Sequence, residues 1–201
     1  MTRSKAVLAL LACAVLAPAA ARAELLVNPE AESGNLTGWT DALGNGFDVW
    51  FVGSPPTYSG FWCFWGGANG PAGARTNELR QDVSVVGLAS GIDTGLSLGI
   101  FTGRARSSAT ATARMVVEYR NTGGTVLGTF DTGPMAPPNS WLLAQDSRAV
   151  PIGTRSVRVR LIGVRTSGTS TDAYFDALSL TIEQPVSAHA ATWGRIKRLF
   201  R

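Results

Sequence analysis

The sequence predicts an all-β domain, built as a single two-layered sandwich. Two segments, 113–120 and 156–161, alternate apolar and polar side chains, and a period of two is typical of a strand with one buried face. Glycine supplies 23 and proline 10 of the 201 residues, which favours a turn-rich architecture over a helical bundle. Turn-forming clusters separate the candidate strands at intervals of roughly ten residues, as expected for a β-sandwich.

The candidate strands fill the body of the chain, residues 24–183, where no segment keeps a helical period. A turn at 121–124 predicts a hairpin between the strand at 113–120 and its successor. In chain order we predict strands at 25–27, 47–52, 61–65, 78–85, 96–102, 113–120, 125–131, 141–150, 156–161 and 173–182. Two Gly- and Pro-rich segments, 53–60 and 66–73, are predicted loops at the ends of the sandwich.

Residues 1–23 have the features of a cleaved signal peptide. Arg3 and Lys5 form a positive start, an apolar stretch too short to span a bilayer follows, and 21–23 match a small-x-small cleavage site. We therefore predict export, to the medium or the cell surface. An alternative is a lipoprotein, acylated at Cys13.

Beyond the body, the sequence predicts a linker at 184–191 and a basic amphipathic tail at 192–201. Thr192 is suited to cap a short helix that has one apolar and one cationic side. This helix would be too short to cross a membrane. The tail either contacts the cell envelope, serves as a sorting signal, or is a solvated terminus. Its apolar residues are Trp193, Ile196, Leu199 and Phe200, and its cations are Arg195, Lys197, Arg198 and Arg201.

Charge and cysteine content exclude two classes of protein. The formal net charge is +4, but the excess of basic residues lies in the leader and the tail, and the body holds more acidic than basic side chains. This distribution argues against a nucleic-acid-binding surface. Without the leader, Cys63 is the only cysteine, so no internal disulfide framework forms. Cys63 is either a small buried side chain or the site of an intermolecular bridge.

Motifs at both ends of the body resemble a known family. Residues 26–40 read LVNPEAESGNLTGWT and are similar to the opening "NPxFExGxLxGW" of bacterial galactose-binding-like jelly-roll modules, among them the CenC-type carbohydrate-binding modules. Residues 173–180 read AYFDALSL and are similar to the final strand of those modules. The resemblance covers 24–183 and implies a jelly-roll sandwich whose opening and closing segments lie side by side. Ala31 departs from the pattern, because the family usually has an aromatic residue there.

The resemblance also implies a structural calcium ion between the two motifs. Its candidate ligands are Glu32 and Asp176, with Asn28 as a third, because calcium prefers hard oxygen ligands. Such an ion would join the first and last strands of a domain that lacks disulfides. The alternative is that Glu32 is an exposed turn residue and Asp176 bonds the backbone. Trp39 is expected to be a core residue.

The ligand that the resemblance favours is an extracellular polysaccharide or glycan. Sugars present apolar C–H faces with hydroxyl rims, so their sites need a flat ring and nearby hydrogen-bonding groups. The aromatic run within 50–65, with the polar residues after it, is the richest such region. Alternation in the strand at 61–65 puts Trp62 and Trp65 on opposite faces. We predict four ligand-binding residues: Tyr58, Trp62, Asn69 and Arg75.

Catalysis is not expected. His189, the only histidine, lies in the linker, so the body has no imidazole for triad or zinc chemistry. No spacing singles out a pair of carboxylates, and Gly66-Gly67 lacks the ending of a phosphate loop. The sequence therefore predicts an exported, non-catalytic binding module. The alternatives are a structural or adhesive surface protein with buried aromatic residues, and an enzyme with an unrecognised carboxylate pair.

Overall fold

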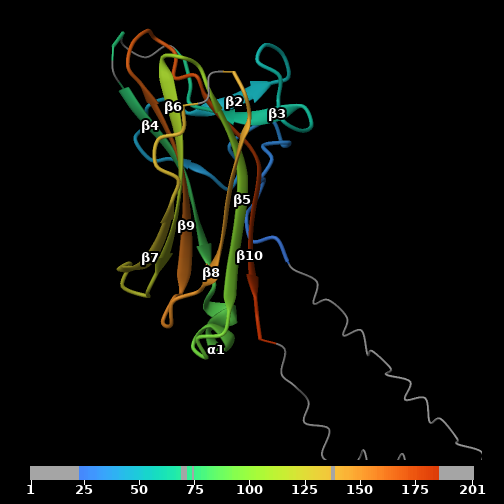
Figure 1. Ribbon diagram of the computed structural model, residues 1–201, viewed down its shortest axis with the longest axis vertical. Coiled ribbons are helices and arrows are strands. Elements are labelled where there is room, and N and C mark those ends of the chain that lie inside the picture. Colours follow the sequence, from blue (N-terminus) through green and yellow to red (C-terminus); the bar gives the residue numbers. More distant parts are fainter. Residues whose placement is uncertain (1–22, 69–71, 74, 137–138, 186–201) are drawn as a thin grey trace, which may run out of the picture.

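The computed structural model describes residues 23–68, 72–73, 75–136 and 139–185, which form two antiparallel five-stranded sheets packed face to face (Figure 1). The first sheet contains, in spatial order, β1 (Thr40–Asp41), β4 (Arg75–Ser84), β9 (Ser156–Arg165), β6 (Ala111–Arg120) and β7 (Val126–Asp131). The second contains β2 (Asp48–Phe51), β3 (Trp62–Trp65), β10 (Ala173–Glu183), β5 (Leu98–Ser107) and β8 (Leu142–Ala149). The predicted all-β sandwich is confirmed.

Alternation correctly predicted which side chains face the core. In β6 the residues at odd positions from 113 to 119 are fully buried, and in β9 the same holds from 157 to 161. Trp39 packs against Phe64 with ring centroids 5.0 Å apart, and both belong to the core. Ala31, the residue that departs from the pattern of the resembling modules, is also fully buried, so a small side chain fills this position of the core.

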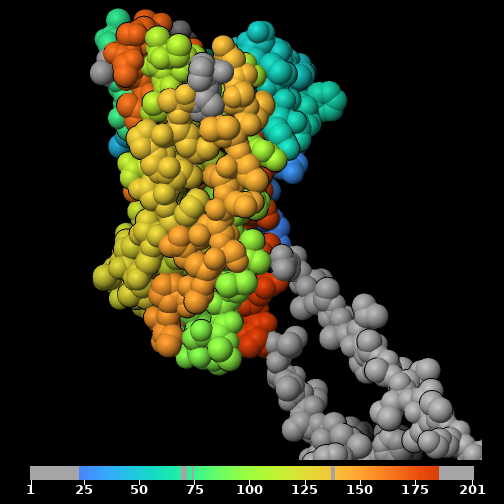
Figure 2. All heavy atoms as spheres, in the orientation of Figure 1, coloured from blue at the N-terminus to red at the C-terminus, as the bar shows by residue number. Residues whose placement is uncertain are grey.

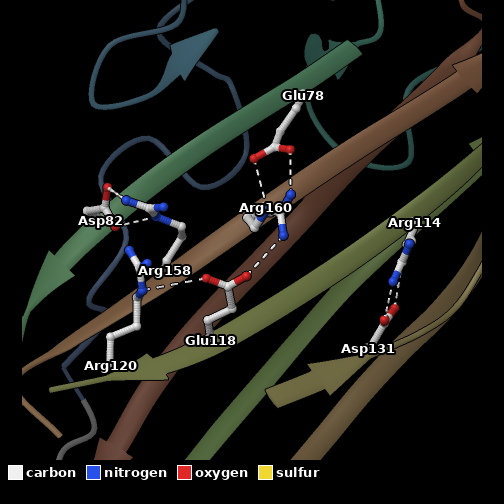
Figure 3. A network of polar contacts seen from close by, with 8 residues as sticks. All are labelled: Glu78, Asp82, Arg114, Glu118, Arg120, Asp131, Arg158 and Arg160. Carbon is white, nitrogen blue, oxygen red and sulfur yellow. Dashed lines mark hydrogen bonds and ion pairs between the residues drawn. The ribbon is translucent and has the colours of Figure 1, made fainter. Parts of the chain in front are cut away.

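The outer face of the first sheet is a network of ion pairs (Figure 3). Arg160 of β9 bridges Glu78 of β4 and Glu118 of β6, at 2.6 and 3.0 Å. On the same face Arg158 binds Asp82 at 2.7 Å, and other pairs join Arg120 to Glu118 and Arg114 to Asp131. Because these charges neutralise one another, this face offers little unpaired charge to a ligand.

The chain ends of the body lie side by side, as the resemblance implied. The backbone amide of Leu25 donates to the carbonyl of Leu180 at 3.0 Å, and the Leu180 amide donates to the Glu24 carboxylate at 3.0 Å. The segment 25–27 nevertheless forms no strand, since only isolated hydrogen bonds connect it to β10.

Three short elements were not predicted: β1, the 3-10 helix η1 (Val86–Leu88) and α1 (Ala89–Ile92). Each has four residues or fewer, which is too few for a periodic pattern to develop. α1 lies at the end of the sandwich opposite β2 and β3 (Figure 1). The loop at 53–60 also differs from the prediction, because it folds over the outer face of the second sheet (see below).

Several predicted features lie outside the described residues: residues 1–22 of the leader with Cys13, the ligand candidate Asn69, most of the linker, and the tail at 192–201. Within the described part of the chain, no helix has the length and apolar character needed to cross a membrane.

Candidate functional site

The outer face of the second sheet brings together residues from four strands. Tyr174 of β10 pairs with Trp65 of β3 on one side and with Arg106 of β5 on the other, so the three side chains form one row. Trp50 of β2 points to the same face, next to Trp65, with ring centroids 5.2 Å apart. This row of three rings and one guanidinium group lies at the end of the face from which the β9–β10 loop departs.

A cavity of about 490 Å³ lies over this row, and we call it the aromatic cavity. Its floor consists of Trp50, Trp65, Tyr174 and Arg106. A volume of this size is typical of small-molecule sites. Residues at the strand ends and in the loops form its walls: Ser54 and Pro55 after β2, Ser107 at the end of β5 and Ser108 after it, Asn139 before β8, and Ser170 and Asp172 before β10.

The aromatic rings of the floor are fixed by packing against one another. The Trp65 and Tyr174 rings are nearly parallel, with centroids 6.5 Å apart, and Trp50 meets the Tyr174 ring edge-on at 6.0 Å. Burial raises the pKa of the Tyr174 hydroxyl, and the Asp172 carboxylate adds to this effect. The buried Trp65 Nε1–H group has no hydrogen-bond partner among the described residues. A bound acceptor or a water molecule would satisfy this donor.

Arg106 and Asp172 place opposite charges in the cavity without forming an ion pair. Among the residues that the structure describes, Arg106 has no hydrogen-bond or ion-pair partner within range. Asp172 accepts a hydrogen bond from the Ser170 hydroxyl. A guanidinium group only donates and a carboxylate only accepts, so the cavity offers both kinds of hydrogen bond to a ligand.

The connection between β2 and β3, residues 53–60, crosses the outer face of the second sheet, and we call it the strap. Trp50 Nε1 donates to the Pro55 carbonyl at 3.1 Å, and Trp141 Nε1 donates to the Pro56 carbonyl at 3.3 Å. Tyr58 lies over the Arg104 guanidinium group, 4.5 Å from its ring centroid, as in a cation–π contact. In Figure 2 the teal spheres, which include β2, the strap and β3, protrude at one side of the molecule.

Asp176 and Glu32 fasten this strap from beneath. Asp176 Oδ2 accepts hydrogen bonds from the backbone amides of Tyr58 at 2.8 Å and Ser59 at 3.0 Å. Glu32 accepts from the amides of Phe61 at 3.0 Å and Trp62 at 2.9 Å. Asp176 is fully buried, and desolvation raises its pKa to about 6 against the opposing effect of the amide hydrogen bonds. The two motifs of the chain therefore meet at one segment.

These carboxylates do not by themselves fit a calcium ion. Calcium takes six to eight oxygen ligands, whereas the oxygens of Asp176 and Glu32 face N–H donors. The Asn28 side chain binds within its own loop, to the Asn35 carbonyl and the Ser33 amide. In the described part of the chain, no group of three or more His, Cys, Asp or Glu residues is arranged to hold a metal. Calcium binding stays a prediction from the resemblance.

The predicted ligand residues do not lie together. Tyr58 is on the strap, outside the lining of the aromatic cavity. Trp62 points to the opposite face of β3 from Trp65 and packs against the core and over Gly34. Arg75 belongs to the first sheet and donates to the Asn45 side chain. Whether any of them contacts a ligand stays untested.

The residues that line the cavity were only partly visible in the sequence. Trp50 and Trp65 belong to the predicted aromatic region, and alternation put Trp65 on the face opposite Trp62. Tyr174 and Arg106 gave no local signal, because they reach the site through the pairing of β10 with β3 and β5.

Comparison with known proteins identifies the fold, through solved structures alone. The sequence matches no family model and no curated protein. Among solved structures, TmCBM61 in complex with β-1,4-galactotriose aligns with a TM-score of 0.54 and 15% identity over 81% of this chain and 99% of that one. Family 16 Carbohydrate Binding Module-2 aligns with a TM-score of 0.51 and 17% identity over 78% and 98%. The chain has the jelly-roll fold of carbohydrate-binding modules.

This jelly roll is also found in an enzyme. A cyclase from Fischerella sp. TAU aligns with a TM-score of 0.57 and 14% identity, over 83% of this chain and all of the other. At such identities the likeness establishes the fold alone, and the function has to be argued from the site.

Proposed function

We propose that the protein is an exported, non-catalytic binding module, whose aromatic cavity holds a neutral unit of an extracellular polysaccharide or glycan. The observation that carries the proposal is the floor of the cavity, where three aromatic rings lie beside a guanidinium group that has no partner among the described residues, with a carboxylate in the wall. Fixed rings offer a stacking surface for the C–H face of a sugar. The fold similarity to modules named for carbohydrate binding supports the same conclusion.

The charges of the cavity favour a neutral ligand. A sugar hydroxyl both donates and accepts, so one ligand can bond Arg106 and Asp172 at the same time. A ligand with a net charge would gain from one of these groups and be repelled by the other. The orphaned Trp65 Nε1–H adds a further donor for a hydroxyl or ring oxygen.

The composition of the cavity supports binding over hydrolysis. Glycoside hydrolysis commonly uses two carboxylic acids on either side of the scissile bond. Asp172 is the one acidic residue among the described residues that line the cavity. Histidine, the commonest general base, is absent from the described lining as well.

Export through the leader at 1–23 and contact of the tail at 192–201 with the cell envelope complete the proposal. Deleting residues 192–201 and measuring how the protein divides between cells and medium tests the tail. The proposed contact requires that the truncated protein move to the medium, and unchanged partitioning contradicts it.

A glycan array probed with the protein lacking its leader tests the ligand class. Arg106→Gln and Asp172→Asn should each weaken the binding of array hits about tenfold or more, because a buried partner loses its hydrogen bond. Arg80→Gln is the matched control, since Arg80 lies in β4 of the opposite sheet. An empty array contradicts glycan binding and favours the structural or adhesive alternative.

A further inference from the structure

The strap divides the outer face of the second sheet into two separate hollows. On one side lies the aromatic cavity. On the other side Ile100, Thr102, Gln145 and Ser147 line a smaller cavity of about 360 Å³, which contains no ring beyond that of Phe101. Both hollows lie along β5, with Arg106 in the first and Thr102 in the second.

The strip of sheet between the hollows is covered where it crosses β3 and β10. Cys63 and Asp176 point to the outer face of the sheet, yet Cys63 is 1% exposed and Asp176 is 0% exposed. On the neighbouring strand, Arg104 lies beneath the Tyr58 ring. Over β3 and β10 the described strap therefore closes the sheet between the aromatic cavity and the second hollow, whereas Leu143 of β8, which pairs with Arg104, is exposed.

The strap is also firmly attached at this crossing. Its backbone donates two hydrogen bonds to Asp176, and the segment just after it donates to Glu32. Trp50 and Trp141 bind its carbonyl groups from either side. Because the attachments come from β2, β10, the first motif and the start of β8, opening the crossing requires breaking several contacts at once.

We propose that the strap makes the aromatic cavity a site for the end of a glycan chain, and that internal segments of a long chain are not bound. This inference rests on the proposed function. A terminal unit enters the cavity from solvent, with the rest of the chain pointing outward. An internal segment would need room on both sides of the bound unit. Along the strand direction, the strap bounds the cavity on one side, and the loops that contain Ser108 and Ser170 bound it on the other side.

Binding of matched sugar series tests this inference. The probes are galactose, xylose and glucose, each with its β-1,4-linked trisaccharide and polymer, measured by calorimetry with the full chain after removal of the leader. For the series that binds, the affinity per chain end should differ by less than about threefold between the trisaccharide and the polymer. At equal mass, a polymer shortened about tenfold should bind about ten times as much protein, because it has more ends.

Gln145→Ala in the second hollow serves as the matched variant, since Gln145 is exposed and its loss should not disturb folding. It should leave the affinity for the polymer unchanged, whereas Arg106→Gln lowers it. A polymer that binds equally well per unit mass at both lengths, or a loss of affinity in Gln145→Ala, overturns end recognition while glycan binding stands. Absence of binding in all three series together with an empty glycan array overturns the proposed function, and the inference with it.

Discussion

The buried carboxylate of Asp176 accepts a 2.8 Å hydrogen bond from the backbone amide of Tyr58, which lies 118 residues earlier in the chain. The contact joins the last strand to the strap that walls the aromatic cavity. Asp176 does not line that cavity, but it fastens the strap to which the wall residues Ser54 and Pro55 belong. The aspartate of the closing motif therefore supports the proposed site from behind.

Replacing Asp176 by alanine should destabilise the protein and loosen the strap. The amides of Tyr58 and Ser59 would lose their acceptor at a part-buried place, which costs at most about 1–3 kcal/mol for each group left unsatisfied. Urea unfolding measures the loss. Asp176→Asn keeps one acceptor oxygen and should lose less, and Asp48→Ala, at an exposed position in β2, is the control. A stability of Asp176→Ala equal to that of the control would show that the contact contributes nothing.

Gly60 is the point where the strap meets Glu32. Its φ of +56° is left-handed, and a β-carbon there would overlap the Glu32 carboxylate. Gly60→Ala should therefore cost more than the roughly 1–2 kcal/mol of left-handed strain, because Glu32 must also leave the Phe61 amide. Thermal unfolding measures the change.

Gly44→Ala isolates the strain. Gly44 has a φ of +62°, and a β-carbon there meets nothing within 4 Å. Equal losses in the two variants would mean that the Glu32 contact adds no stability at this position.

Sequence periodicity predicted which side chains of β6 and β9 are buried, because a strand with one face in the core imposes alternation on its own residues. It also predicted that Trp62 and Trp65 face opposite ways. It could not determine which of the two faces belongs to the core, since that depends on the neighbours of β3 in the sheet. The structure turns Trp62 to the core and Trp65 to the cavity.

The set of residues at the cavity depends on contacts between distant strands. Tyr174 meets Trp65 and Arg106 only because β10 lies between β3 and β5, and strand order leaves no mark in the local sequence of any of the three. The path of the strap was hidden for the same reason. Its Gly and Pro content predicts a loop, but the acceptor that holds it belongs to the final strand.

The ion pairs of the first sheet predict a loss of stability in acid. The hydrogen bond from Arg158 holds the pKa of Asp82 below its ordinary value of 3.8. A carboxyl group with a lowered pKa in the folded state adds stability above its ordinary pKa, and this stability is lost as the pH falls through the lowered value. Asp82 is 47% exposed, so the pair contributes only about 0.5 kcal/mol after solvent screening.

Asp82→Asn should therefore be less stable than the natural chain at neutral pH and equal to it in strong acid. Denaturant unfolding across the pH range measures the difference. Arg158→Gln should show the same dependence, and the double variant should lose little more than either single one, because both changes remove the same pair. A difference that persists below the lowered pKa would contradict this account.

Removal of calcium is the sharpest test of the two motifs. The carboxylates of Asp176 and Glu32 are already satisfied by backbone amides, so the strap does not need an ion to hold it. We expect the same thermal midpoint in excess calcium and in a chelator. An ion at concentration c that binds only the folded state would stabilise that state by RT ln(1 + c/Kd). The thermal midpoint would therefore rise with the calcium concentration. Glu32→Gln decides the origin of any such rise: a calcium site between the motifs would lose it, whereas a weak site elsewhere would keep it.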